Sequence, residues 1–378
     1  KLDKVEYECV SCKERFDETA KTTMLRKGVW RATKPEKAGI TAGFWLNGLA
    51  SPLGWLSWYE ICDEFLKAKE NPALMRTWVN TRKAETFSYE FQAKLNAEAL
   101  MDQRSDYLPA TIPDPVVCLC LGVDVQGGMG SASSRIEVSC WGFSADPSGI
   151  AENMYLIDHN IIYGDPNQGE VWAGLDVLLN AEYEHPKGGV LKISGCAVDS
   201  GGLATQSVYD YCMKRRDKGV IAVKGSSRSG GPIIGKGSRV DINYSGRIRK
   251  KSGVVYLLNT EDIKDRIYSK IKGTGKIFFH SETTEEYFKE ITGEYRTQKT
   301  NSRGYPVSTY EKKPNQAVEK LDCCVYAYGV YCLLLKTTIK GKFFETYANK
   351  LLNSVNSSKK QRLKSNSKVT KKSYVTHW

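Results

Sequence analysis

Blocks of apolar residues predict a succession of strands and helices beyond residue 115. The apolar run from Val116 to Val125 has the length and unbroken character of a strand buried on both faces. Six further segments are predicted strands: Arg135–Phe143, Asn153–Tyr163, Val190–Asp199, Val220–Lys224, Val254–Leu258 and Lys276–His280. Apolar residues at helical spacing predict four helices: Glu170–Tyr183, Thr205–Arg216, Glu261–Lys272 and Asn315–Leu335.

The order of these elements predicts the fold class. Three strands in succession suggest a meander, and they are followed by helix, strand, helix and strand. This is the order of an RNase H-like domain, so we expect an α/β fold with a mixed sheet flanked by helices over residues 116–336.

The rest of the chain divides into three smaller parts. A helical linker region is predicted over residues 39–115, with helices at Trp55–Lys69 and Pro72–Lys83, and it follows a short segment over residues 1–38. Three prolines within residues 109–115 predict the boundary with the α/β domain. Residues 337–378 are rich in Ser, Asn and Lys, which predicts a basic, disordered tail.

The charge of the chain indicates the kind of partner that it could bind. The formal net charge is +12 and the pI is near 9.0, which suits a polyanionic partner. Eleven Lys or Arg and one acidic residue, Glu345, lie in the stretch from Lys336 to Trp378, so this stretch carries +10 of the charge. The tail is thus a candidate for binding DNA, although a merely solubilising role explains it almost equally well.

The cysteines and the apolar runs indicate the compartment. Eleven cysteines are an odd number, and several lie within apolar runs, as reduced buried thiols do, so we expect a cytosolic protein. The longest apolar run, Cys323–Leu335, has thirteen residues, whereas a membrane span needs about 18 to 20. We therefore expect a soluble protein without a membrane partner.

Three aspartates occupy positions that suit metal chemistry. Asp124 and Asp199 each end an apolar strand and precede glycines that turn the chain, and Asp322 lies at the start of the last predicted helix. Carboxylates can hold two Mg²⁺ or Mn²⁺ ions for phosphodiester hydrolysis, since hard divalent ions prefer oxygen ligands. A single aspartate at a strand end is more often a turn former or helix cap, but three in this order favour a catalytic site.

A cysteine pair near the start of the chain suggests a second metal. Cys9 and Cys12 have the spacing that supplies half of a tetrahedral zinc site, so residues 1–38 form a partial zinc-ribbon-like segment. No second pair follows within the next fifty residues, and we expect any missing ligands upstream of Lys1. Two free cysteines in a frayed terminus explain the pair equally well.

Taken together, the motifs resemble the large terminase subunit of the gpA type from lambda-like phages. The resemblance covers residues 9–335 and rests on the sequences around Asp124, Asp199 and Asp322, on Ala222–Gly225, and on the segment from Gly43 to Trp55. It implies an endonuclease that cuts concatemeric double-stranded viral DNA in the cytoplasm of a bacterial host. It also implies a small terminase subunit and a portal protein as partners, and an ATPase portion that this chain lacks.

The segment between Lys224 and Lys251 invites two interpretations. Gly230–Gly237 nearly spells a phosphate-binding loop, but a glycine replaces the required Ser or Thr, so we expect this chain neither to bind nor to hydrolyse ATP. The better interpretation is a flexible basic loop beside the catalytic edge that grips DNA phosphates, and a solvated hairpin is the alternative. The predicted DNA-binding residues are Lys224, Arg228, Lys236, Arg239, Arg247, Arg249, Lys250 and Lys251.

Two glutamates and two other protein classes complete the predictions. Glu294 is a weaker candidate for a metal ligand, and Glu319, one helical turn before Asp322, is a candidate partner of the ligands. One alternative is an RNase H-like resolvase or transposase, which would share the carboxylates but not the segment from Gly43 to Trp55. A non-catalytic module that binds DNA or docks on a portal is the other, and metal-dependent plasmid nicking distinguishes it from a nuclease.

Overall fold

The computed structural model divides the chain into two compact units, Lys1–Phe91 and Gln92–Trp378. The structure describes residues 4–33, 39, 43–69, 72–87, 97–127, 134–146, 152–226, 231–273, 276–300, 306–339 and 341–369.

The first unit is small, and most of its regular elements are helices. Its elements are β1 (Tyr7–Glu8), β2 (Arg15–Phe16), α1 (Lys21–Arg26), α2 (Trp58–Ala68), α3 (Pro72–Trp78) and a turn of π-helix (Val79–Lys83). Helix α2 begins three residues later than predicted because Ser57 caps it, and Ser57 and Glu60 form a reciprocal capping box. Trp58 is buried against the rings of Tyr7 and Phe16, at 5.8 and 6.3 Å between centroids.

The second unit begins before the predicted proline boundary. Within residues 109–115, Ile112 is buried, and the Ala110 amide donates to the Ile157 carbonyl at 2.8 Å. The Tyr107 hydroxyl donates to the carbonyl of Leu156 at 2.9 Å. The predicted boundary near residue 116 is therefore wrong, because these prolines shape a segment that packs on the sheet instead of a linker between units.

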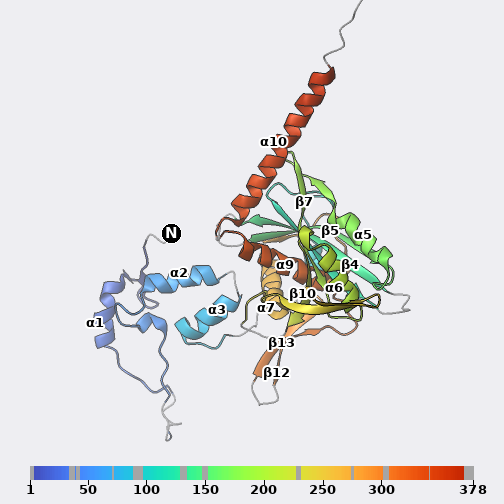
Figure 1. The fold of residues 1–378 in the computed structure, drawn as a ribbon. Helices are drawn as coiled ribbons and strands as arrows, with labels where there is room; N and C mark the ends of the chain where they lie inside the picture. The colour runs from blue at the N-terminus through green and yellow to red at the C-terminus, as the bar shows by residue number, and fades with distance from the viewer. Residues whose placement is uncertain are drawn as a thin grey trace, which may run out of the picture. The chain divides into compact units, whose positions relative to one another are not determined.

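A nine-stranded mixed sheet forms the centre of the second unit (Figure 1). Its strands are β3 (Cys118–Gln126), β4 (Arg135–Ala145), β5 (Glu152–Tyr163), β6 (Glu182–Glu184), β7 (Val190–Asp199), β8 (Val220–Ser226), β9 (Ser238–Tyr244), β10 (Arg247–Asn259) and β11 (Ile277–Phe278). Their order is β11-β5-β4-β3-β7-β8-β10-β9, and β6 pairs with β7 outside this path. Strand β3 is antiparallel to β4 and parallel to β7, and β7, β8 and β10 are mutually parallel.

Helices cover both faces of this sheet. They are α4 (Ala97–Met101), α5 (Gly169–Leu179), α6 (Thr205–Lys214), α7 (Thr260–Lys272), α8 (Glu285–Ile291), α9 (Glu319–Thr337) and α10 (Phe343–Val369). Side chains alternate along β3: Cys118 and Cys120 pack in the core beneath α7, α8 and α9, whereas Leu119 and Leu121 pack in the core beneath α5 and α6. This confirms the predicted α/β class, a mixed sheet flanked by helices as in RNase H-like nuclease domains.

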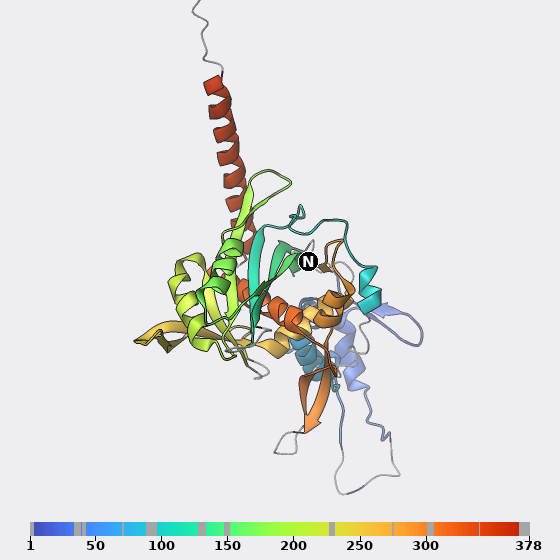
Figure 2. The ribbon, with the colours of Figure 1, turned by 90° about the vertical axis from the view of Figure 1, so that its right-hand side faces the viewer.

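The predicted disordered tail is wrong over Phe343–Val369. These residues form α10, whose second half extends away from the sheet (Figures 1 and 2). Phe343, Tyr347, Leu351 and Val355 are all buried, and their spacing of four residues places them on one face of the helix. The Ser354 hydroxyl also accepts a hydrogen bond from the Val190 amide at 3.0 Å, so α10 is fastened to the start of β7.

Two smaller departures from the predicted elements remain. The predicted helix Glu170–Tyr183 ends at Leu179, and β6 follows it. A separate antiparallel hairpin of β12 (Glu294–Thr300) and β13 (Pro306–Lys312) precedes α9, where no strands were predicted.

Over the described part of the chain, the helices are too short or too polar to span a membrane.

Candidate functional site

Asp124 and Asp199 lie side by side at one edge of the sheet. Strands β3 and β7 are parallel neighbours, and their last paired residues are Val123 and Val198, so the two aspartates are the next residues on each strand. Side chains alternate between the two faces of a strand, and Cys120 and Ala197 belong to the core on the α9 face. Asp124 and Asp199 therefore lie on that same face. The first and fourth of the predicted strands are therefore neighbours in the sheet.

Helix α9 brings Asp322 to the same edge. The helix lies directly on β3, where a Cβ atom at Gly122 would stand 1.8 Å from the carbonyl oxygen of Cys323. Only glycine permits this approach, and the Cys323 thiol also donates to the Glu137 carbonyl on β4 at 3.2 Å. Asp322, one residue earlier in the first turn of α9, is thereby held beside the ends of the strands, with 24% of its side chain exposed.

The carboxylates in this cluster act on one another. Asp124 is 3% exposed, and burial raises its pKa to about 8, with further contributions from the charges of Asp322, Asp199 and Glu319. Burial likewise raises the pKa of Asp322, which the charge of Lys264 opposes. The site therefore concentrates negative charge that the chain's own cations only partly neutralise.

Neutral hydrogen-bond donors hold two of these carboxylates. The Gln126 side-chain amide donates to Oδ2 of Asp124, and the Gly201 amide donates to Oδ1 of Asp199 at 3.1 Å. Burial raises the pKa of Asp199, whereas backbone hydrogen bonds and one from Tyr326 lower it. Burial and the charges of the three aspartates raise the pKa of Tyr326 well above its ordinary value, so this phenol stays protonated as a donor. Sequence reasoning gave neither Gln126 nor Tyr326 a role.

The two predicted glutamates differ in their surroundings. Glu319 acts on Asp124 through its charge, and its Oε2 accepts a hydrogen bond from the Val318 amide at 3.0 Å. Glu294 begins β12 and is bound to Lys264, whose Nζ lies 2.7 Å from its Oε2. The charge of Glu294 raises the pKa of Asp322, so it lies near that aspartate.

A buried carboxylate on β4 was missed by sequence reasoning. Glu137 pairs directly with Asp124 across the strands and is 2% exposed. Burial favours a higher pKa for Glu137, but His159 at 3.4 Å, the hydrogen bond from Arg135 and the charge of Lys320 lower it to about 2. A charged residue inside the apolar segment Arg135–Phe143 was the available signal. Arg135 and Lys320 neutralise part of the charge of Glu137, which sets it apart from the strand-end aspartates.

The donor set fits hard divalent cations. The two strand-end side chains, Asp124 and Asp199, are carboxylates, and oxygen ligands are those that Mg²⁺ and Mn²⁺ prefer. The raised pKa of Asp124 reflects its burial first and the neighbouring negative charges second, and a divalent ion would offset both effects. Within the ranges that the structure describes, no three His, Cys, Asp or Glu side chains stand close enough to form a finished metal cage. An ion would therefore have to draw the carboxylates together.

The predicted DNA-binding residues do not form one surface. Lys224 lies at the carboxylate edge, where its charge lowers the pKa of Asp199, and exposed Lys236 lies near that end, beside Leu257. The β9–β10 hairpin carries most of the others away: Arg247 pairs with Tyr244, roughly 20 Å along β9 from the level of the aspartates, whereas Arg239 pairs with Val254 and stays near that level. Arg239, Lys250 and Lys251 are exposed on this hairpin, Arg249 is ion-paired with Asp210, and Arg228 lies outside the described residues.

Sequence proximity therefore misled the prediction of a single basic loop beside the catalytic edge. The segment instead contains two strands joined at a turn in which Ser245 and Gly246 have positive φ, and this hairpin leads the chain away from the edge. Residues close in sequence are consequently separated in space.

Cys9 and Cys12 lie on the turn between β1 and β2 in the first unit. Both thiols are free, and the Lys13 amide donates to the Cys9 carbonyl at 2.9 Å, which closes the turn. Hydrogen bonds from the backbone of Cys12 and Ser11 lower the pKa of Cys9 and favour a thiolate. The pair has the form of half a zinc site, but the described part of the chain offers no third ligand beside it.

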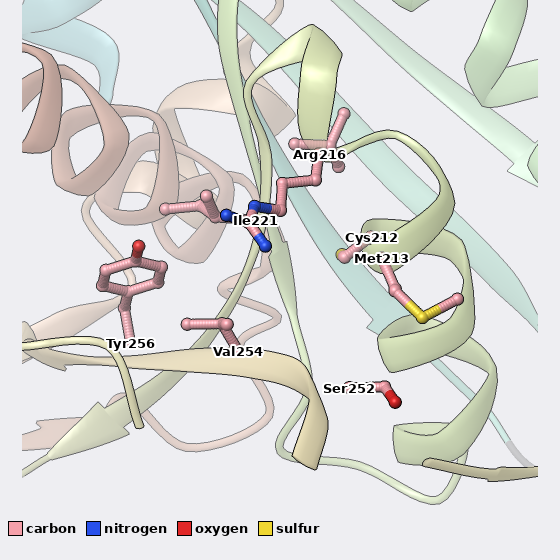
Figure 3. A pocket seen from close by; sticks show the side chains of 8 residues that line it. Cys212, Met213, Arg216, Ile221, Ser252, Val254 and Tyr256 are labelled. Atoms are coloured by element: carbon pink, nitrogen blue, oxygen red, sulfur yellow. The ribbon is translucent and has the colours of Figure 1, made fainter. Parts of the chain in front are cut away.

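A pocket of about 110 Å³ lies away from the carboxylates (Figure 3). Its lining comes from the end of α6 and the following turn, the start of β8, and β10. Cys212, Met213, Ile221 and Val254 give it an apolar wall, with Arg216 beside them. None of the predicted site residues lines this pocket, so it adds nothing to the candidate nuclease site.

Comparisons with known proteins match most of the chain. The family model described as the endonuclease domain of the terminase large subunit gpA matches residues 41–339. The chain is 28% identical over 314 residues to the terminase large subunit of Enterobacteria phage P21, covering 78% of the chain and 44% of that protein. It is 29% identical over 287 residues to the terminase large subunit of Escherichia phage lambda, covering 72% of the chain and 41% of that protein.

Two conclusions follow from these matches. The chain spans less than half the length of these two relatives. The family match also selects a terminase nuclease over the resolvase or transposase alternative. Because the model covers most of the chain, this protein belongs to the gpA family of terminase large subunits, as their nuclease portion.

Proposed function

We propose that this chain is a divalent-metal-dependent endodeoxyribonuclease that cuts concatemeric double-stranded viral DNA during genome packaging. The proposal is supported above all by the meeting of Asp124, Asp199 and Asp322 at one edge of the sheet of a terminase endonuclease domain. The charge of Asp322 and that of Asp199 both act on Asp124, although these residues are far apart in sequence.

The three aspartates would hold two Mg²⁺ or Mn²⁺ ions. When bound, such ions supply an activated water and stabilise the leaving oxygen of the phosphodiester. The chain's own residues orient the ligands: Gln126 holds Asp124, and Tyr326 with the Gly201 amide holds Asp199. Glu319 lies in the first turn of α9, and its charge contributes to the raised pKa of Asp124. We assign it a place beside the metal ligands.

The substrate contacts follow from the placement of the cations. Lys224 lies at the carboxylate edge and would contact the phosphates beside the cleaved bond. The exposed cations of the β9–β10 hairpin would contact the duplex farther away without reading bases. We also propose the packaging partners that the family implies: a small terminase subunit, a portal protein and the ATPase portion of a longer terminase chain.

Plasmid cleavage tests the proposal. Purified protein should convert supercoiled plasmid to nicked or linear DNA with Mg²⁺ or Mn²⁺, and EDTA should stop the reaction. Replacing Asp124, Asp199 or Asp322 with Asn keeps the side-chain shape but removes a negative ligand, so each variant should lose most activity. Cleavage that survives EDTA, or normal cutting by the three variants, contradicts the two-metal assignment.

The matched control is Asp217→Asn. Asp217 is an exposed carboxylate in the short turn after α6, and its replacement makes the same change in charge without touching the cluster. This variant should cut like the wild type. A non-catalytic DNA-binding module would bind plasmid in all these preparations and cut in none.

A further inference from the structure

Lys264 is a buried cation placed between two carboxylates at the edge of the candidate site. It lies on α7 and is 9% exposed. Its Nζ lies 2.7 Å from Oε2 of Glu294 and 3.6 Å from Oδ1 of Asp322. A buried lysine is costly unless paired, so its partners are part of what the fold maintains.

The position of Lys264 is fixed from the side of the β12–β13 hairpin. The Tyr268 hydroxyl donates to the Glu294 carbonyl at 3.0 Å, and the Glu294 amide donates back to this hydroxyl at 3.3 Å. On the same helix, Asp265 accepts a hydrogen bond from Tyr310 of β13 at 2.7 Å. These contacts join the base of the hairpin to α7, so Glu294 and Lys264 form a rigid pair.

The two contacts of Lys264 differ in kind. The contact with Glu294 is a short, charge-assisted hydrogen bond, whereas Asp322 is approached at 3.6 Å through one carboxylate oxygen. A carboxylate has two oxygens, so a cation beside Oδ1 is compatible with metal coordination through the other. The hairpin and α7 therefore hold the ammonium group of Lys264 in a fixed position beside the carboxylate of Asp322 on α9.

We propose that Lys264 is a positioning residue that orients Asp322 for metal binding, with Glu294 as its anchor. The inference rests on the proposed nuclease function and refines it. Glu294 then supports the site indirectly, instead of serving as the metal ligand considered from the sequence. The arrangement resembles a ligand held by an outer hydrogen-bonding partner, whose loss typically costs about 10- to 100-fold in metal affinity or activity.

Mn²⁺ binding measured by isothermal titration calorimetry on the full chain tests this role. Lys264→Met should weaken Mn²⁺ binding about tenfold or more. Lys264→Arg retains the charge and donors, so it should restore most of the affinity. The matched control is Lys270→Met, because Lys270 lies on the same helix, is also about 9% exposed and is paired at 3.1 Å with Glu152. This control should lose stability but leave Mn²⁺ affinity unchanged.

A double variant distinguishes positioning from simple charge neutralisation. If Lys264 only neutralises Glu294, then adding Glu294→Gln to Lys264→Met removes the unpaired carboxylate and restores Mn²⁺ affinity. If Lys264 orients Asp322, the double variant regains thermal stability but not affinity, and plasmid nicking stays low.

Two results overturn the inference: recovery of Mn²⁺ affinity in the double variant, or binding by Lys264→Met as tight as that of the wild type. Should Lys264→Met not fold, the Arg variant and the double variant decide by the same measurement. Failure of the proposed function looks different, because the wild type itself then neither binds Mn²⁺ nor nicks plasmid, and both proposals fall.

Discussion

Replacing Asp124 with Asn should make the metal-free protein more stable at alkaline pH. Asp124 is 3% exposed, and burial, followed by the charge of Asp322, raises its pKa from 3.8 to about 8. Each pKa unit corresponds to about 1.4 kcal/mol, so ionising this carboxyl within the fold costs on the order of 5 kcal/mol. Asn has a similar shape and cannot ionise, so the variant escapes this cost.

The sign of the pH dependence follows from proton binding. Below about pH 4 the carboxyl is protonated in both the folded and the unfolded state, so the wild type and the variant should be similar. Between about pH 4 and pH 8 only the folded state keeps the proton, and the free energy of unfolding of the wild type falls as pH rises. The advantage of the Asp124→Asn variant should therefore grow through this range and level off above pH 8.

Urea unfolding in EDTA between pH 4 and pH 9 measures this difference. Repeating the series in Mn²⁺ should stabilise the wild type more than the variant, because a ligand that binds the folded state raises its stability. Asp217→Asn serves as the control and should show no growing advantage. Parallel pH profiles for wild type and Asp124→Asn, or a gap that widens toward acid, would refute the raised pKa.

Three further perturbations test other parts of the structure. Gly122→Ala should lower the free energy of unfolding in urea by about 3 kcal/mol or more and abolish nicking, because the added Cβ meets the Cys323 carbonyl oxygen. The control Gly169→Ala, at an open helix start, should leave stability unchanged or raise it. Deleting α10 should lower the melting temperature markedly, since four buried apolar side chains are lost at about 1.5–3 kcal/mol each; an unchanged melting temperature would mean that α10 does not pack. Lys224→Met should slow cutting more than Arg247→Met, while both should flatten the salt dependence of DNA binding in a filter assay, by about one ion each.

The strands that carry the site were predictable because they are buried on both faces. Such strands read as unbroken apolar runs, so β3 and β7 were predicted with nearly correct ends, and an aspartate at each end stood out. That the two strands are neighbours followed from the fold class rather than from either strand alone. The placement of Asp322 also required the fold class, because nothing in the sequence of α9 states which strand it crosses.

Helix α10 was not predicted, because its few apolar residues are surrounded by polar ones. In α10, Phe343, Tyr347, Leu351 and Val355 have helical spacing, but the Lys, Ser and Asn residues around them dominate the average composition. Composition decides whether a segment can fold alone, whereas α10 folds against an existing sheet. The prolines of residues 109–115 misled for the opposite reason, because proline marks a turn whether or not a domain ends there.

Partners of the site residues were unpredictable for a deeper reason. Lys264 and Glu137 owe their significance to neighbours that are distant in sequence, and each is an ordinary charged residue within its own helix or strand. Gly122 is a comparable case: within β3 it weakens a strand, and only the presence of α9 explains it. A glycine inside an otherwise apolar strand was nevertheless a visible sign that another backbone approaches there.

The close approach at Gly122 links the fold to the chemistry. Asp124 lies two residues after Gly122 on the same face of β3. Asp322 directly precedes Cys323, whose carbonyl oxygen packs against Gly122. The glycine therefore sets the separation between two carboxylates that repel each other in the absence of metal. Packing of α9 on β3 supplies the stability that offsets this repulsion, and an ion that binds there, as proposed, would return part of the free energy spent in bringing the charges near one another.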